Sequence, residues 1–473
     1  MNPETAEMVI ARPTGELATP LPSHGRATRA RLDGTGFWTR MRADEQRMRA
    51  ARESWRALWS SRLLVWATAL ATVLTLGFGP ARGAFNPPGV TRGFGALGDL
   101  LAAPVARWDA AWYLVIAHFG YRPDLGVYTA SRAAFFPLYP LGIRSLATLG
   151  LPPIVAGVTL SVVALALALY GIHRLTTLEL AGMGGERVAV AARLAVLVTA
   201  FAPMAFFFSA VYSESLYLAL SVGLFWSARN GRWAYVGMLG ALAGATRSTG
   251  LVLALPALWI YLYGPREDRA ADFVHAGYRL LLPRFRVRRE ALWLLLLPAG
   301  VVLYGVYLSL NGGGALEPFN AQAVWGRHFA GPYVGVWDGA KAAFEGARQL
   351  IAGQSGHVYF TAAVGSPDVA AGHNLTLLAF LAAAVPAVVG VFRRLPLAYG
   401  LYVLAALALP LSDPVSAQPL MSLPRFLLVL FPLGIWLAAW LTEHPRAQRP
   451  VLVCSAVLLV LFGAQFATWH WVA

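Results

Sequence analysis

A short aromatic segment carries the clearest chemistry of the sequence, because an acid lies among flat rings. The segment reads Arg107-Trp108-Asp109-Ala110-Ala111-Trp112-Tyr113, with Tyr121 eight residues further on. On a helix, Asp109 and Tyr113 share one face, and the two tryptophans share another. Aromatic rings pack on the C–H faces of a sugar, and a carboxylate can take the proton of a hydroxyl. We therefore predict a sugar site with Asp109 as general base; an interfacial aromatic belt is the alternative, but it leaves the acid unexplained.

Four further residues beside predicted apolar stretches are candidates for the same site: Tyr212, Glu214, Arg247 and Arg425. Polar groups near hydrocarbon are costly and tend to be functional. Glu214 has a structural alternative, because Ser213 is a suitable N-cap and an acid is favourable at a helix N-terminus. Each arginine either extends to the membrane interface or holds a phosphate. We predict that Arg247, with Arg425 as the second candidate, binds the phosphate of a substrate.

Membrane-spanning helices must position these residues, because the composition excludes a soluble enzyme. Of the 473 residues, 58% are hydrophobic and 13% are charged, and the mean hydropathy is +0.57. Soluble domains usually contain about 25% charged residues. The apolar residues form long, nearly charge-free runs, and a run of about 18 or more predicts a membrane span. The predicted fold class is an all-α polytopic membrane protein.

The distribution of arginines predicts the topology. The apolar runs predict eleven spans, at 63–79, 153–172, 188–208, 213–229, 232–246, 250–264, 291–310, 374–392, 396–412, 425–441 and 449–467. Arginines gather in the loops 173–187, 229–232, 264–290, 393–394 and 442–449. The positive-inside rule makes these loops cytoplasmic, so that the N-terminus is inside, the C-terminus is outside, and the loops 80–134 and 311–373 are outside. Residues 135–150 are short and interrupted by prolines; we interpret them as a half-helix or re-entrant segment, and whether they cross stays open.

The sequence before the first span has two parts. Residues 1–35 are rich in Pro, Gly, Thr and Arg without an apolar period, which predicts a disordered cytoplasmic tail. Residues 36–60 place apolar side chains and arginines at helical spacing, which predicts a basic amphipathic helix on the inner leaflet, with a partner-binding helix as the alternative. Residues 61–473 form the predicted membrane domain. The formal charge of +15 then reflects arginines that meet cytoplasm and anionic lipid, and no nucleic-acid partner is expected.

Four motifs in order resemble a known family. They are Arg-Trp-Asp-Ala-x-Trp-Tyr-Leu-x-Ile-Ala-x-x-Gly-Tyr at 107–121, Ala-Phe-Phe-Pro-Leu-Tyr-Pro at 134–140, Ser-Ala-Val-Tyr-Ser-Glu-Ser-Leu at 209–216 and Ala-Thr-Arg-Ser-Thr-Gly at 245–250. Over roughly residues 100–255 the chain resembles the PIG-V-type mannosyltransferases of the GT-C superfamily. The resemblance implies a GT-C-like fold with outer juxtamembrane helices, a polyprenyl-phosphate-linked mannose donor, and Asp109 as the base in the first outer loop. Eukaryotic relatives act on the glycosylphosphatidylinositol anchor, whereas the Arg-rich tail and the composition of this chain indicate a bacterial member with another acceptor.

The sequence thus favours an inverting glycosyltransferase in the cell membrane, with its active site facing outside. The expected partners are a polyprenyl-phosphate sugar donor, a lipid or glycan acceptor with a free hydroxyl, and membrane lipids. No cofactor is expected, since no acidic pair demands a divalent metal, although the sequence leaves a metal requirement open. A polytopic transporter or lipid-sugar flippase is the alternative, and it predicts ionisable groups near the midplane and repeated, broken helices. The charged residues here lie at span ends instead.

Overall fold

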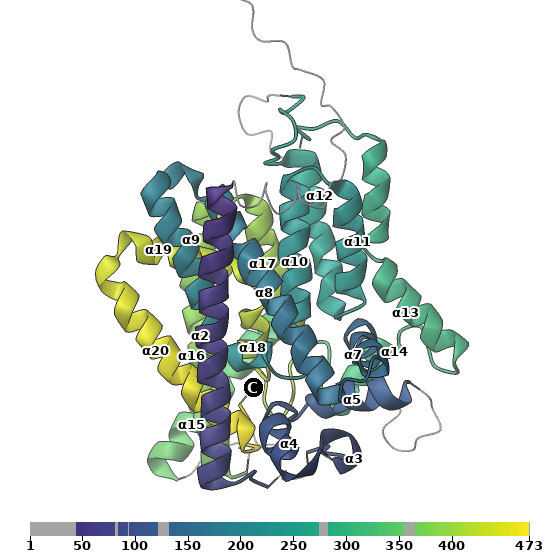
Figure 1. Cartoon of the computed structure of the whole chain (residues 1–473), viewed down its shortest axis with the longest axis vertical. Coiled ribbons are helices and arrows are strands. Elements are labelled where there is room, and N and C mark those ends of the chain that lie inside the picture. Colours follow the sequence, from purple (N-terminus) through teal and green to yellow (C-terminus); the bar gives the residue numbers. More distant parts are fainter. Residues whose placement is uncertain are drawn as a thin grey trace, which may run out of the picture. The chain divides into compact units, whose positions relative to one another are not determined.

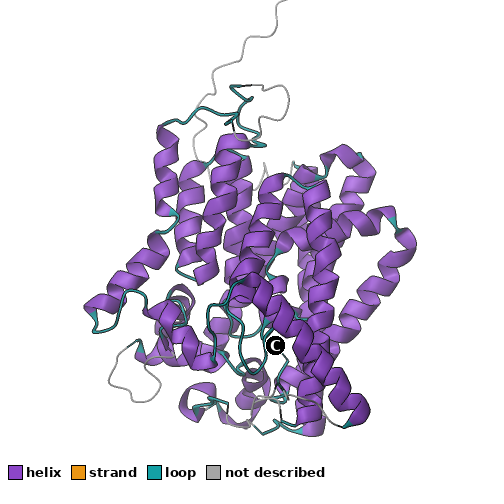
Figure 2. Ribbon diagram, turned by 180° about the vertical axis from the view of Figure 1, so that it is seen from behind, coloured by secondary structure: helices purple, strands orange, loops and turns teal. Residues whose placement is uncertain are grey.

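The computed structural model describes residues 44–80, 84–92, 94–121, 132–273, 282–353, 359 and 365–472. Within these residues the chain is helical and has no β-strand, and isolated bridges join Arg327, Val415 and Gln418. Figure 2 shows the helices and the loops that join them. The chain divides into two units, residues 1–48 and 49–473, and the first is described only from residue 44. The predicted tail 1–35 lies outside the described residues.

The first helix joins two elements that the sequence analysis separates. Helix α2 runs without a break over Glu45–Leu76, so it contains most of the predicted amphipathic helix and most of the predicted first span. Residues 45–76 contain no glycine or proline, and therefore nothing ends the helix before Gly77. Residues 36–43 lie outside the described residues.

Short helices follow α2 and carry the aromatic motif. They are α3 (Pro88–Thr91), α4 (Gly95–Ala102), the 3₁₀ helix η1 (Ala103–Val105), α5 (Ala110–Phe119) and α7 (Leu138–Thr148). Helix α7 corresponds to the predicted segment 135–150 and has 11 residues. Such a helix is about 16 Å long, half of the roughly 30 Å hydrocarbon core, which agrees with its interpretation as a half-helix.

The central part of the chain forms a bundle. Its elements are α8 (Pro153–Glu179), η3 (Ala181–Met183), α9 (Gly185–Ala200), η4 (Ala205–Phe208), α10 (Glu214–Arg229), α11 (Trp233–Gly244), η5 (Ser248–Leu253) and α12 (Ala254–Tyr263). Helix α8 packs against both α9 and α10, and α10 also packs against α11. Alanine, leucine and phenylalanine side chains on these contact faces are fully buried, so the core of the protein lies here.

The remaining elements complete the bundle. They are η6 (Arg289–Leu296), α13 (Ala299–Leu310), α14 (Glu317–Asn320), η7 (Ala321–Trp325), α15 (Pro332–Ala352), α16 (Pro367–Arg394), α17 (Leu397–Ser412), α18 (Leu423–Leu428), α19 (Phe431–Glu443) and α20 (Pro445–Ala467). Helix α15 packs against α16 and α17, and α19 packs against α9. The chain therefore returns to its own first half, which brings residues beyond 400 next to residues near 200.

The apolar helices agree with a membrane protein but do not confirm eleven spans. Four of the described helices are long and apolar enough to cross a membrane, namely α2, α8, α16 and α20, and the number rises to six if two bent helix pairs each count as one span. Several predicted spans correspond to shorter helices: α9, α10 and α17 have 16 residues each, or about 24 Å. One bent pair, Gly95–Val105 with Ala110–Phe119, turns by 115° and flanks Asp109.

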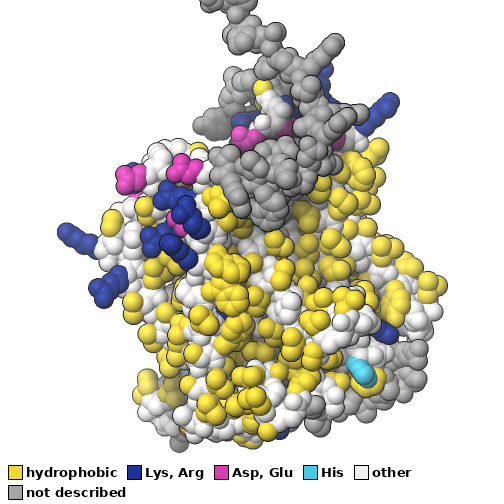
Figure 3. All heavy atoms as spheres, viewed as in Figure 1, with side chains coloured by type: hydrophobic (Ala, Val, Ile, Leu, Met, Phe, Trp, Pro, Cys, Tyr) yellow, Lys and Arg dark blue, Asp and Glu magenta, His cyan; other side chains and the backbone are white. Residues whose placement is uncertain are grey.

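The two ends of the bundle differ in content. In Figure 1 the short helices α3, α4, α5, α7 and α14 lie toward the lower end, where the C-terminal residues also lie. Figure 3 shows hydrophobic side chains over the middle of the same face, while Lys, Arg, Asp and Glu side chains gather mostly toward the upper end.

Candidate active site

The local backbone around Asp109 is a sharp corner between two helices. Helix α5 begins at Ala110, and Asp109 occupies its N-cap position. The peptide N–H of Asp109 donates to the hydroxyl of Tyr212 at 3.1 Å, and that hydroxyl donates to the carbonyl of Arg107 at 3.1 Å. Tyr212 therefore holds the corner from a segment about a hundred residues away. Trp108 lies before the helix with φ 54°, so it does not share a helix face with Trp112 as predicted.

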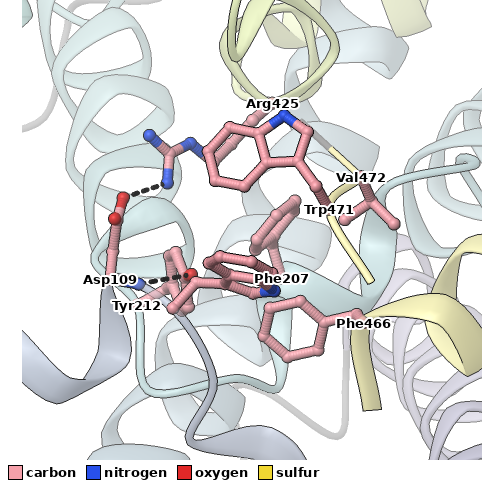
Figure 4. A pocket seen from close by; sticks show the side chains of 8 residues that line it. Asp109, Phe207, Tyr212, Arg425, Phe466, Trp471 and Val472 are labelled. Carbon is pink, nitrogen blue, oxygen red and sulfur yellow. Dashed lines mark hydrogen bonds and ion pairs between the residues drawn. The ribbon is translucent and has the colours of Figure 1, made fainter. Parts of the chain in front are cut away.

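Two carboxylates and two arginines form one ion-pair cluster. The carboxylate oxygen Oδ2 of Asp109 lies 2.6 Å from Nη1 of Arg425 (Figure 4). Glu214 Oε1 lies 2.7 Å from Nη1 of Arg247 and 3.5 Å from Nε of Arg425. The four residues come from the start of α5, the start of α10, the turn before η5, and α18. The structure thus brings together Asp109, Glu214, Arg247 and Arg425, which the sequence analysis selected separately.

The two carboxylates differ in exposure, and this separates their roles. The side chain of Asp109 is 27% exposed, whereas that of Glu214 is 2% exposed between the two arginines. Asp109 is therefore the carboxylate that an incoming hydroxyl can reach. Glu214 is instead buried and in contact with both guanidinium groups. The serine before it, Ser213, occupies the N-cap position but makes no capping hydrogen bond; its hydroxyl lies 2.9 Å from that of Tyr113.

A small pocket opens beside Asp109. It is lined by Trp108, Asp109, Phe207, Tyr212, Arg425, Phe466, Trp471 and Val472 (Figure 4). The pocket is small: the space between its atoms is about 230 Å³, and this figure includes open solvent. Its walls are mostly aromatic, and the carboxylate of Asp109 and the guanidinium of Arg425 lie among them. Sequence reasoning missed Phe207, Phe466 and Trp471, because no charged residue is adjacent to any of them in the sequence.

Backbone strain also concentrates at this pocket. Among the described residues other than glycine, a positive φ occurs at Trp108 (54°), Ser422 (67°) and Trp469 (60°). Trp108 lines the pocket, the ring of Trp469 meets that of Trp108 edge-on at 5.5 Å, and the hydroxyl of Ser422 accepts from Arg425 at 3.4 Å. Left-handed backbone at a bulky residue costs about 1–3 kcal/mol and persists mostly at functional sites. The clustering of all three therefore supports a functional role for this place.

A third arginine near the pocket is Arg327, which the sequence analysis did not select. Its guanidinium donates to the carbonyls of Asp413 at 3.0 Å and Met421 at 3.4 Å. Burial and the neighbouring Arg425 lower the pKa of Arg327 to about 10. The guanidinium carbons of Arg247, Arg327 and Arg425 all lie 5.6–5.8 Å from the centre of one phenyl ring, that of Phe426. Two of these three arginines are paired with the carboxylates of Glu214 and Asp109, so the region carries one net positive charge from these five residues.

A buried arginine in α2 supports the segment that carries Phe207 and Tyr212. Arg62 is fully buried and donates to the carbonyls of Ala200 at 3.0 Å and Ala205 at 2.6 Å. It also donates to the hydroxyl of Ser209 at 2.6 Å. These contacts satisfy carbonyl groups left free where α9 ends, so the chain can leave the helix inside the protein. The sequence analysis did not select Arg62, although an arginine at the edge of a predicted span is a feature that could have indicated it.

Several predicted substrate contacts do not line the pocket. Glu214 and Arg247 belong to the ion-pair cluster beside it, and Tyr113 is 7% exposed and meets Ser213. The other three are Arg107, Trp112 and Tyr121. Arg107 is 1% exposed; it donates to the carbonyl of Ala467, and burial, followed by the charge of Arg92, lowers its pKa to about 9. Trp112 is 8% exposed, and its ring stacks on that of Phe85. Tyr121 donates to the carbonyl of Phe135 at 2.5 Å and packs against Tyr304. The structure places these three side chains in the scaffold around the site.

Within the described residues, no group of three His, Cys, Asp or Glu side chains lies close enough together to hold a metal ion. The acids of the site are paired with arginines instead. A carboxylate such as that of Asp109 can accept a proton, and guanidinium groups can stabilise negative charge.

Comparisons with known proteins support the resemblance seen in the motifs. The family model for mannosyltransferase (PIG-V) matches residues 78–259, which confirms a PIG-V-type resemblance for that region. GPI alpha-1,6-mannosyltransferase 2 of Rattus norvegicus is 31% identical over 176 residues, which are 36% of this chain and 34% of the relative. The chain thus matches about a third of the relative's length. No solved structure matches the chain.

Proposed function

We propose that the chain is a membrane mannosyltransferase that moves mannose from a polyprenyl phosphate to a hydroxyl of a lipid or glycan acceptor. The single observation that carries the proposal is the reachable Asp109 carboxylate, paired with Arg425 at 2.6 Å at the edge of an aromatic pocket. The matched region 78–259 contains Asp109, Tyr212, Glu214 and Arg247, so the resemblance and the geometry support the same site.

In the proposed reaction, Asp109 is the general base. The acceptor hydroxyl attacks the anomeric carbon of the donor while its proton passes to Oδ2 or Oδ1 of Asp109. A new carbon–oxygen bond forms on the face opposite the departing phosphate, so the configuration of the sugar inverts. The exposure of Asp109, 27% of its side chain, permits the contact with a hydroxyl that this step needs.

The arginines serve the leaving group in this proposal. The bond between the anomeric carbon and the phosphate oxygen breaks, and its electron pair stays on the lipid phosphate. Arg425 lines the pocket and carries the charge-assisted hydrogen bonds that stabilise such an oxygen. Arg247 and Arg425 both contact the carboxylate of Glu214. Glu214 keeps both guanidinium groups in place before the donor arrives, so little reorganisation is needed during the reaction.

The proposed orientation places the pocket at the outer face of the membrane. The arginine-rich loops 173–187 and 264–290 would then face the cytoplasm. The mannose donor would reach the pocket from the outer leaflet, and the acceptor from the outside.

A transfer assay tests the proposal. Purified protein in detergent is incubated with polyprenyl phosphate carrying radiolabelled mannose and with candidate acceptors, including glycosylphosphatidylinositol glycans because of the relative in the rat. We expect label to appear in the acceptor, in proportion to free polyprenyl phosphate released. A transporter or flippase would move the labelled lipid across vesicles without releasing polyprenyl phosphate. Transport without transfer under conditions that keep the protein folded would refute the enzyme.

A further inference from the structure

The residues after α20 form a wall of the pocket. Helix α20 ends at Ala467, and the peptide N–H of His470 donates back to the carbonyl of Gln465 at 2.9 Å. Trp469, at φ 60°, then turns the chain toward the pocket. As a result Trp471 and Val472 line the pocket together with Asp109, which lies more than 350 residues earlier in the chain. Both residues lie outside the region 78–259 that matches the family.

The indole of Trp471 is held in place from two sides. Its Nε1–H donates to the side-chain oxygen of Gln418 at 3.0 Å, and Gln418 is itself 3% exposed. The ring also meets that of Trp108 at 5.0 Å and 85°, an edge-to-face contact. Because its polar atom and one contact direction are already satisfied, the plane of this ring is set before a ligand binds. A fixed aromatic surface of this kind lowers the entropic cost of binding.

We propose that Trp471 is the surface on which the transferred sugar ring of the donor packs. This inference rests on the proposed function. The anomeric carbon must come within about 3.5 Å of an acceptor oxygen that Asp109 contacts. Asp109 and Trp471 line the same pocket, so a sugar ring whose anomeric carbon lies at Asp109 is next to the indole of Trp471. Figure 4 shows Trp471 beside Arg425 on one side of this space, with Phe207 and Phe466 on the other.

The chemistry of the pocket favours a sugar over the lipid chain as the partner of Trp471. A pyranose has polar edges and an apolar C–H face, and the negative face of an aromatic ring attracts such C–H groups. A carboxylate and a guanidinium in the same small pocket can bind the polar edge of a sugar and its phosphate. A polyprenyl chain has no partner for either charge, and burying it there would desolvate both. Trp471 is thus assigned to sugar binding.

Paired binding measurements test this assignment. Polyprenyl phosphate with mannose and polyprenyl phosphate of the same length without it are titrated into purified full-length protein in detergent. We expect Trp471→Ala to weaken binding of the mannose-bearing lipid about three- to tenfold, with binding of the sugar-free lipid unchanged. Trp471→Phe should retain most of the affinity, and Trp471→Leu should behave like the alanine variant. Trp337→Ala is the matched control, because that tryptophan is 62% exposed on α15 and does not line the pocket.

The outcomes separate this inference from the proposed function. Equal losses for both lipids would assign Trp471 to the phosphate or the chain and overturn the inference, and so would unchanged binding of both. Thermal melting identifies variants that are folded, and the leucine variant serves if the alanine variant is not. Wild-type protein that prefers the mannose-bearing lipid through Trp471 but transfers nothing would refute the proposed function alone. Transfer with no contribution of Trp471 to sugar preference would refute this inference alone.

Discussion

Replacement of Asp109 by Asn is the sharpest test of the proposed mechanism. The amide keeps the size of the side chain, and its oxygen can still accept the hydrogen bond from Arg425. The peptide N–H of residue 109 still donates to Tyr212, because that contact belongs to the backbone. What is lost is the negative charge and with it the proton acceptor. The variant therefore isolates proton transfer from the architecture of the corner.

The expected effect on turnover is much larger than that on stability. Loss of a general base reduces the rate by about 10²–10⁴-fold. The cost in stability is about 1 kcal/mol, because Asp109 is 27% exposed and Arg425 still lies 3.5 Å from Glu214. A loss of that size lowers the melting temperature by only a few degrees. The variant should thus be folded and almost inactive at ordinary temperatures.

The assay measures turnover and donor affinity of wild-type and Asp109→Asn protein in the same detergent, after thermal melting has shown both to be folded. Asp338→Asn is the matched control, since its carboxylate pairs with Lys341 at 4.0 Å on the surface of α15 and should leave turnover unchanged. Donor affinity should be largely kept in the Asp109 variant. A folded Asp109→Asn protein whose turnover is within threefold of wild type would show that Asp109 is not the base.

Three further outcomes follow from the site and the bundle. Arg247→Ala should lower donor affinity and turnover together, each about tenfold, because a charge-assisted contact near the phosphate is removed. Titration of the donor and kinetics on the same preparation measure both quantities. If neither changes, Arg247 does not bind the phosphate. Arg62→Met should lower the melting temperature by several degrees, because three buried acceptors in residues 200–209 lose their donor. An unchanged melting curve would show that Arg62 does not stabilise this segment. Gly314 and Gly182 are both exposed and have room for a side chain. In intact cells, an impermeant maleimide should label a cysteine placed at Gly314 but not one placed at Gly182. Labelling at Gly182 alone would invert the predicted topology.

Much of the helix layout could be predicted because its signals are local. Apolar runs without charge and the prolines and glycines between them indicate where α8, α16 and α20 lie, since a helix must bury its apolar surface in lipid or protein. The number of spans could not be predicted in the same way. Helices such as α9 and α10 are apolar because they pack inside the bundle, and a sequence window does not distinguish protein contact from lipid contact.

The candidate base could also be found from the chain alone, because an acid among aromatic residues is unusual wherever it occurs. The residues that surround it could not be predicted from the chain alone. The partner of Asp109 is Arg425, 316 residues later, whereas the neighbouring Arg107 turns away to the carbonyl of Ala467. The two side chains leave the chain on either side of the corner at Trp108, which has φ 54°.

Residue types and their spacing were therefore sufficient for the class of protein, for the approximate helices and for selecting Asp109 as the candidate base. The pairing of charges, the wall formed by Trp471 and the approach of Arg327 depended on how α18, α20 and the loop before α15 pack against the first half of the chain. The physical reason is the sequence separation over which the interactions act. Helix formation and burial are governed by neighbours within a few residues, whereas a site assembled from segments hundreds of residues apart exists only once the bundle has closed around it.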